Sequence, residues 1–293
     1  MKTIAFVGLG AMGLPMVQNL ITAGYGVHGV DINPASLSAI TAMGGKAFTN
    51  TKEACVGADL LMILVVNASQ AKQVLFDSGA IDVLPAGGIV CLMSTCPPAE
   101  VEDIAKQVQA TGRRLIDAPL SGGVVGATKG SLTVMAACDE KTFNDIEDVF
   151  KVIGERIFHV GQQPGQGAMC KTVNQLLCGL HIAVAAEAFS LAKKSGLNLE
   201  MLLEIMSGSA ASSWMLKDRG PRMLESDPIV TSAVDIFVKD LSIVMQAGRD
   251  AKAALPLTAA AYQLFLSASG RGEGRHDDSQ VIRSYDLLNG VAK

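Results

Sequence analysis

The feature that most constrains this chain is a glycine-rich turn close to its N-terminus. An apolar run, Thr3 to Val7, leads directly into a GxGxxG motif, and a helical pattern from Leu14 to Ala23 follows. Between a strand and a helix, the first glycine permits the tight turn, the second lets the backbone approach a pyrophosphate, and the third allows close helix packing. An ordinary strand-to-helix turn is the plain alternative. The motif predicts a dinucleotide site at Gly8, Leu9, Gly10, Ala11, Met12 and Gly13.

The second predicted strand, Gly26 to Asp31, ends in a carboxylate. At this place a carboxylate can accept hydrogen bonds from both ribose hydroxyls of NAD, and it repels the 2′-phosphate of NADP. No Arg or Lys lies between Asp31 and Lys46 to hold such a phosphate. We therefore expect NAD as the cofactor. The other interpretation of Asp31 is a helix N-cap or turn residue before Pro34.

Short apolar runs alternate with helical patterns over the first half of the chain. Continuous runs such as Leu60 to Val66 are typical of strands that are buried on both faces, as in a parallel sheet covered by helices. The alternation predicts an α/β fold with a doubly wound, mostly parallel sheet. The expected strands are Thr3 to Gly8, Gly26 to Asp31, Leu60 to Val66, Ile89 to Leu92, Arg114 to Asp117 and Leu132 to Ala136, with another near Ile157 to Val160.

The pattern changes after a stretch rich in Gly and Gln at residues 161–167. One long helical pattern runs from Ala168 to Lys194, and Ser195-Gly196 provides the expected C-cap. Clear strand patterns are absent beyond it. We therefore predict a nucleotide-binding domain at residues 1–163 and an all-α C-terminal domain at residues 164–293. Further helices are expected at Asn198 to Ser207, Trp214 to Leu224, Ala233 to Ala251 and Pro256 to Ser269.

The composition excludes several classes of protein. With 49% hydrophobic residues, 18% charged residues and a net charge of -4, the chain is expected to be globular and not to bind nucleic acid. The mean hydropathy is positive, +0.34, but no run reaches the roughly 18 to 20 uninterrupted apolar residues of a bilayer span. The six cysteines include no CxxC pair, so we expect neither a metal site nor a disulfide framework. Reduced thiols and the absence of a signal-peptide pattern predict a cytoplasmic protein without a membrane partner.

Three loops follow predicted strands, and ligands collect beyond the carboxyl ends of strands in an open α/β sheet. Val65, Val66 and Asn67 close the third strand, Thr95 follows the fourth, and Ser121-Gly122-Gly123 follows the fifth. The serine hydroxyl and the unhindered backbone N–H groups of the two glycines suit an anionic carboxylate. The same residue types also form plain turns.

The long helix from Ala168 carries a polar face. Lys171, Asn174, Gln175 and Cys178 stand at positions i, i+3, i+4 and i+7, which share one side of a helix. Lysine is suited to proton transfer when burial or a neighbouring cation lowers its pKa. Spacing alone leaves open a solvated lysine that shares a face with two amides.

Taken together, these motifs resemble the β-hydroxyacid dehydrogenase family over nearly the whole chain. The resemblance implies an N-terminal Rossmann domain, a helical C-terminal domain for substrate binding and oligomerisation, and homodimers or homotetramers formed through the helical domains. The motifs are Phe6 to Gly13 with Pro15-Met16, Asp117 to Gly123, Gly165 through Lys171 to Asn174, Lys239-Asp240-Leu241, and Gly272, Gly274, Asp278 and Ser279.

The resemblance also implies a role for each candidate residue. Lys171 would transfer the proton of the substrate hydroxyl, and Asn174 would hydrogen-bond near that hydroxyl. Ser121, Gly122 and Gly123 would hold the substrate carboxylate.

Residues at the cofactor are implied in the same way. Thr95 and Lys239 would contact the nicotinamide end of NAD, and Val65, Val66 and Asn67 would border the adenine-ribose and pyrophosphate path. From its surroundings in the sequence, Lys239 can equally be a side chain that extends to solvent and pairs with Asp240 or Asp235.

The implied activity is the NAD-dependent oxidation of a small hydroxy acid. The segments Ser212 to Met215 and Ser232 to Leu241 resemble those of family members that act on a four-carbon sugar acid, and Val66 to Gln70 agrees with this resemblance. The resemblance implies L-threonate, oxidised at C2 to a 2-oxo acid, as the substrate. Reduction of tartronate semialdehyde and oxidation of 3-hydroxyisobutyrate are the alternatives. A dinucleotide-binding regulatory protein without catalysis is a further possibility, but such a protein would not need Lys171, Asn174 and the Ser121 loop together.

Overall fold

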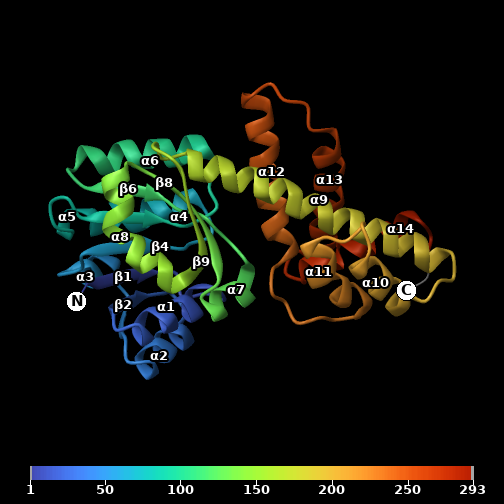
Figure 1. Cartoon of the computed structure of the whole chain (residues 1–293), viewed down its shortest axis with the longest axis horizontal. Helices are drawn as coiled ribbons and strands as arrows, with labels where there is room; N and C mark the ends of the chain where they lie inside the picture. Colours follow the sequence, from blue (N-terminus) through green and yellow to red (C-terminus); the bar gives the residue numbers. More distant parts are fainter. Residues whose placement is uncertain (1, 292–293) are drawn as a thin grey trace. The chain divides into compact units, whose positions relative to one another are not determined.

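The structure is a computed structural model that describes residues 2–291 and divides into two compact units, residues 1–171 and 172–293. Figure 1 shows a sheet with covering helices in the first unit and helices in the second. The division falls inside one long helix, α9 (Gln166–Lys194), whose first turn packs in the N-terminal unit. The domain boundary that we placed after residue 163 stays a prediction.

The N-terminal unit is built on a sheet whose order is β3-β2-β1-β4-β5-β6-β8-β7, with β9 paired to β8. The pairs from β3 to β6 are all parallel, whereas β8 is antiparallel to β6 and β7. This confirms the expected doubly wound, mostly parallel sheet. Its strands are β1 (Thr3–Val7), β2 (Gly26–Val30), β3 (Lys46–Phe48), β4 (Leu60–Ile63), β5 (Ile89–Leu92), β6 (Arg114–Asp117), β7 (Leu120–Ser121), β8 (Leu132–Ala137) and β9 (Gly154–Gly161).

Successive side chains of a strand point to opposite faces of its sheet. In the central strands, the side chains on each face pack in a separate apolar core, so both faces of this sheet are buried. Ile4 and Phe6 of β1 belong to one apolar cluster, and Ala5 and Val7 belong to the other. This two-sided burial explains the continuous apolar runs in the sequence. The covering segments are α1 (Gly13–Thr22), α2 (Pro34–Ala42), α3 (Thr51–Cys55), α4 (Ala68–Lys72), η1 (Gln73–Asp77), α5 (Ala80–Val83), α6 (Pro98–Ala110), α7 (Gly123–Lys129) and α8 (Glu140–Ile153).

Two expectations about the strands were wrong. The strand predicted to reach Val66 ends at Ile63, because β1 turns away at Gly8 and the backbone N–H of Val65 donates instead to the Ser94 hydroxyl. In addition, β3 and β7 were not predicted from the sequence. Both are short, and β3 is largely exposed, so neither has an apolar run that would mark it.

Helices make up the second unit from the body of α9 onward. They enclose an apolar core that includes Ile182 and Phe189 of α9 and a stacked pair, Phe237 and Phe265, with ring centroids 5.2 Å apart. The last helix of this unit was not predicted from the sequence. The segments are α10 (Leu199–Gly208), α11 (Trp214–Leu224), α12 (Val234–Asp250), α13 (Pro256–Ala268), η2 (Ser269–Glu273), η3 (Asp278–Val281) and α14 (Ile282–Leu288).

Helix α9 is long and apolar enough to cross a membrane by length and composition alone. Half of its most apolar window is buried inside the protein. The core helix of a soluble protein passes the same test, so this property is weak evidence for a membrane span. The expectation that the protein has no membrane partner stays a prediction.

Candidate cofactor and substrate site

The glycine-rich turn lies at the point where the strand order reverses, since β1 has β2 on one side and β4 on the other. Gly8 has a φ of 100°, a conformation that L side chains rarely adopt. A Cβ added to Gly13 would lie 1.9 Å from the carbonyl oxygen of Gly8, so only glycine fits there. A Cβ added to Gly10 would meet nothing within 4 Å. The turn therefore combines a tight bend, an open approach to the backbone and close helix packing, which fits a pyrophosphate.

A cavity of about 610 Å³ opens beside this turn. Leu9, Gly10 and Ala11 contribute to its wall, and Asn33 and Ser36 contribute from the start of α2. In open α/β sheets, ligands bind in the crevice at such a switch point. The cavity and the open face of Gly10 together fit a dinucleotide.

Asp31 lies directly after β2 and is tied to the turn. Its Oδ2 accepts a hydrogen bond of 2.6 Å from the backbone N–H of Leu9, and its Oδ1 accepts one of 2.7 Å from that of Asn33. The N-cap of α2 is Asn33, whose side chain accepts from Ala35 N–H. Asp31 is therefore not that cap, but its contact with the Asn33 N–H, two residues further on, is a turn contact of the kind that the other interpretation predicted. Its role at the ribose stays a prediction. Each carboxylate oxygen retains a second lone pair for a ribose hydroxyl.

The other loops expected to border the cofactor lie at the same edge of the sheet. Val65 and exposed Val66 follow β4, and the Val66 N–H donates to Gln70. Asn67 is the N-cap of α4, because its Oδ1 accepts the N–H of Gln70 at 2.9 Å. Thr95 follows β5 and is half-buried. Since β4 and β5 are parallel neighbours, both loops leave the sheet at one edge.

The Ser-Gly-Gly loop joins β7 to α7. Ser121 pairs with Thr133 of β8, which fixes its backbone, and its side chain is half-buried. Gly122 and Gly123 have φ values of 128° and 59°, so both positions favour glycine. A residue with a side chain at either position would be strained in this backbone conformation. The binding of a substrate carboxylate by this loop stays a prediction.

Sequence reasoning assigned no role to Asp117, the last residue of β6. Its carboxylate is 1% exposed, and Oδ2 accepts the N–H groups of Gly165 at 2.9 Å and Ala168 at 2.8 Å. Among the described residues, Oδ1 has no hydrogen-bond partner. Burial raises the pKa of Asp117 to about 6, against the opposing effect of the backbone N–H groups at the start of α9. Asp117 thus fastens the first turn of α9 to the sheet.

All four residues of the predicted polar face lie in α9. Lys171, the last residue of the N-terminal unit, is buried, with 8% of its surface exposed. In the helical unit, Gln175 donates to Oδ2 of Asp240 at 2.5 Å, and the Cys178 thiol lies 3.8 Å from Oδ1 of Asn174. These contacts hold the amide side chains in place along the helix.

Lys239 of α12 forms an ion pair with Asp240, with 2.7 Å between Nζ and Oδ1. The pairing was one of the two interpretations that the sequence left open for this lysine. Trp214 is 55% exposed, whereas Phe237 is 2% exposed and packs in the helical core. Helix packing therefore accounts for Phe237. Ser213 is the N-cap of α11.

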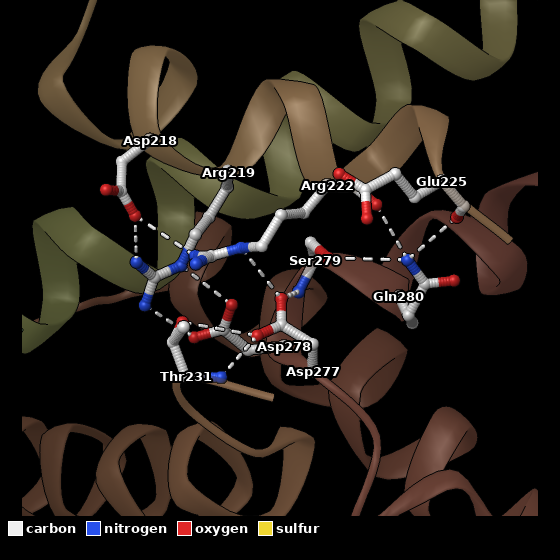
Figure 2. A network of polar contacts seen from close by, with 9 residues as sticks. All are labelled: Asp218, Arg219, Arg222, Glu225, Thr231, Asp277, Asp278, Ser279 and Gln280. Carbon is white, nitrogen blue, oxygen red and sulfur yellow. Dashed lines mark hydrogen bonds and ion pairs between the residues drawn. The ribbon is translucent and has the colours of Figure 1, made fainter. Parts of the chain in front are cut away.

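The last sequence motif belongs to a buried charge network within the helical unit. Arg219 of α11 donates from Nε and Nη2 to the two oxygens of Asp278, at 2.8 and 2.9 Å (Figure 2). Beside it, Arg222 pairs with Asp277, and Asp218 bridges both arginines. Burial raises the pKa of Asp278, and the Arg219 charge opposes this rise. The network joins α11 to η3, two elements that are distant in the sequence. It therefore stabilises the packing of the helical unit.

Over residues 2–291, no three His, Cys, Asp or Glu side chains are grouped so that they could hold a metal ion. Burial raises the pKa of Cys55 and Cys138 to about 12. These thiols therefore stay protonated at neutral pH, which suits small apolar packing and not nucleophilic chemistry.

A Rossmann sheet with a glycine-rich turn at its switch point, followed by a helical second unit, is typical of NAD(P)-dependent oxidoreductases. Relatives named as dehydrogenases place the chain among those that act on CH–OH groups. Family models agree with this class. The model for the NAD binding domain of 6-phosphogluconate dehydrogenase matches residues 3–161, and the model for the NAD-binding domain of NADP-dependent 3-hydroxyisobutyrate dehydrogenase matches residues 165–285. The chain belongs to the β-hydroxyacid dehydrogenase family, of the 3-hydroxyisobutyrate dehydrogenase-like type.

Relatives extend over almost the full length of the chain. An L-threonate dehydrogenase of Cupriavidus necator is 39% identical, covering 97% of this chain and 96% of the relative. Another from Haemophilus influenzae is 38% identical over 99% and 96% of the two chains. A solved structure described as 3-hydroxyisobutyrate dehydrogenase from Salmonella typhimurium is 37% identical with a TM-score of 0.92, covering 97% of this chain and 99% of that one.

Proposed function

We propose that this protein oxidises L-threonate at C2 to the 2-oxo acid, with NAD as its cofactor. The observation that carries the substrate is the similarity, over nearly the whole of both chains, to proteins described as L-threonate dehydrogenases. The N-terminal unit supports the reaction class, because it has a dinucleotide turn, a buried lysine, and a loop whose hydroxyl and N–H groups could bind a carboxylate. A bound NAD would accept the hydride released from the substrate carbon.

The residues of this chain supply binding, orientation and proton transfer. The Ser121 hydroxyl and the N–H groups of Gly122 and Gly123 hold the substrate carboxylate. Lys171, in its neutral form, takes the hydroxyl proton, and its ammonium returns that proton in the reverse reaction. Asn174 donates a hydrogen bond near the hydroxyl.

Cofactor contacts complete the proposed site. Residues 8–13 bind the pyrophosphate, and Val65, Val66 and Asn67 border the path from the adenine ribose. Thr95 and Lys239 contact the nicotinamide end.

The test is the formation or consumption of NADH, read by absorbance, on a panel of L-threonate, D-glycerate, 3-hydroxyisobutyrate and tartronate semialdehyde. We expect the highest kcat/KM on L-threonate. A higher value on tartronate semialdehyde or 3-hydroxyisobutyrate would replace the substrate assignment. Measurable NAD binding without turnover on any compound would favour a regulatory protein that binds the dinucleotide.

The role of Lys171 has its own test. Lys171→Ala is expected to bind NAD as the wild type does and to lose at least about 100-fold in kcat, the usual contribution of a positioned acid or base. More than a tenth of the wild-type kcat in this variant would contradict proton transfer by Lys171.

Asp31 makes the preference for NAD testable. We expect kcat/KM with NAD to exceed that with NADP at least tenfold, and Asp31→Asn to narrow this ratio, since the substitution removes the charge that repels a 2′-phosphate. Asp31 also holds the Leu9 N–H, so binding of both cofactors should weaken and the ratio is the informative quantity. A wild-type preference for NADP would overturn the argument.

We further propose that the protein is a cytoplasmic homodimer or homotetramer that assembles through its helical unit. Val173, Leu177, Val184 and Leu191 form one exposed apolar stripe along α9, each about half or more exposed. The stripe borders a cavity of about 490 Å³ with mostly apolar walls between α9, α10 and the start of α11. A large exposed apolar surface of this kind typically marks a protein interface.

Light scattering on a sizing column tests the assembly. Leu191→Glu is expected to lower the mass to that of a monomer, because it places a charge in the stripe. Lys252→Glu, an exposed change outside the stripe, serves as the control and should leave the mass unchanged. A monomeric wild type at micromolar concentration would rule the proposal out.

A further inference from the structure

Asp117 stands between two parts of the proposed site. It ends β6, where its backbone pairs with Leu92 of β5 and Ala137 of β8. The chain then continues through Pro119, whose carbonyl accepts the Met135 N–H at 3.1 Å, into the loop that begins at Ser121. The backbone at Asp117 is thus fixed on both sides and leads directly to the carboxylate loop.

The side chain of Asp117 holds a segment far away in the sequence. Its Oδ2 accepts the N–H groups of Gly165 and Ala168, which lie on either side of Gln166, the first residue of α9. The first N–H groups of a helix have no partner within that helix. One buried oxygen therefore satisfies two backbone donors and fixes where α9 begins.

Gly167 shows how closely α9 approaches the sheet. A Cβ at this position would lie 2.7 Å from the carbonyl oxygens of both Asp117 and Met135, so no side chain fits. Gly165 has a φ of 98°, which directs the chain into the helix. The first turn of α9 is thus packed directly on the end of β6 and on Met135 within β8.

Lys171 follows within the next turn of the same helix. By the helical hydrogen-bond pattern, its backbone N–H donates to the carbonyl of Gly167, the residue packed against the sheet. A shift of the first turn would therefore carry Lys171 with it. A displacement of about 1 Å at a reacting group can cost about 100-fold in rate.

We infer that Asp117 is a positioning residue, which sets the distance between the proton-transfer lysine on α9 and the carboxylate-binding loop after β7. The inference rests on the proposed role of Lys171. Asp117 need not touch the substrate, because its effect passes through the backbone of α9.

Three variants test the inference. Asp117→Ala removes both hydrogen bonds, and we expect kcat to fall at least tenfold while the Kd for NAD stays within twofold. Asp117→Asn retains a carbonyl oxygen for both N–H groups, and we expect it to recover most of the kcat lost in Asp117→Ala. The matched control is Asp139→Ala, which removes the N-cap carboxylate of α8 and should leave kcat within twofold.

A kcat within twofold of wild type in Asp117→Ala would overturn the inference, as would an Asp117→Asn variant no more active than Asp117→Ala. If Asp117→Ala does not fold, Asp117→Ser takes its place, since a hydroxyl on the shorter side chain cannot accept both N–H groups in the present geometry. For this variant too, a kcat at least tenfold below that of the wild type supports the inference, and a kcat within twofold of it overturns the inference. Lys171→Ala separates the two proposals: activity in that variant refutes the role of Lys171, whereas an inactive Lys171→Ala beside an active Asp117→Ala refutes only the role of Asp117.

Discussion

Asp117→Asn is expected to stabilise the N-terminal unit relative to the wild type, by an amount that increases between about pH 4 and pH 6 and is constant above pH 6. Burial raises the pKa of Asp117 from 3.8 to about 6, so between these values the unfolded chain releases a proton that the folded chain retains. Wild-type stability therefore falls as the pH rises from about 4 to about 6 and changes no further above it. At 1.36 kcal/mol for each pKa unit, the full loss is about 3 kcal/mol, and an asparagine does not incur it.

The assay is urea unfolding, followed by far-UV circular dichroism at pH 5.0 and pH 7.5. Between these pH values, the free energy of unfolding of Asp117→Asn should rise by about 1.5 kcal/mol relative to that of the wild type, by the same linkage. Asp139→Asn is the control, because its hydrogen bond to Thr142 lowers the pKa of Asp139 and no change falls between pH 5.0 and 7.5. An equal difference at both pH values for Asp117→Asn would refute the reasoning.

Two further predictions concern buried charge and the glycine turn. Arg219→Met should destabilise the helical unit by about 3 to 5 kcal/mol, because it leaves Asp278 buried without its partner; urea unfolding followed by Trp214 fluorescence measures this. Gly10→Ala should fold as the wild type does but bind NAD at least tenfold more weakly, whereas Gly13→Ala should also lower the melting temperature, since its Cβ would overlap the backbone. Isothermal titration and thermal unfolding separate these two effects.

Each of these predictions has a control within the chain. Lys193→Met breaks an ion pair with Asp286 in which the lysine is 37% exposed, and such pairs contribute about 0 to 1 kcal/mol. A loss in Arg219→Met no larger than this would contradict the importance of the buried pair. Equal melting temperatures for Gly10→Ala and Gly13→Ala would contradict the different roles of the two glycines.

Much of the fold could be predicted because its signals are local. A strand buried on both faces is apolar throughout, so Ile89 to Leu92 was located with the bounds that the structure has. Arg114 to Asp117 was also located with its bounds, although only Leu115 and Ile116 within it are apolar. The short edge strand β3 has no such requirement, and it was missed. The strand predicted to reach Val66 was too long. The apolar run continues to Val66, but the neighbouring strand β1 has already turned away at Gly8, so no described strand pairs with its last residues.

The candidate site divides in the same way. The glycine turn could be recognised because backbone conformation restricts which residues fit, and that restriction appears in the sequence as GxGxxG. The contacts that hold the site together could not, because they join residues such as Asp117 and Ala168, which are 51 positions apart. The same holds for Arg219 and Asp278 in the helical unit, 59 positions apart.

The sequence by itself determined the class of fold, the dinucleotide turn and the helical second half, since each follows from periodicity or from residues that only one backbone conformation accepts. Only the tertiary structure decided what the buried carboxylates do. A carboxylate in a sequence carries no sign of its partners, and its effect depends on which N–H groups or guanidinium groups folding brings to it and on how much water is excluded. In this chain, that environment makes Asp117 the anchor of α9 and Asp278 the partner of Arg219.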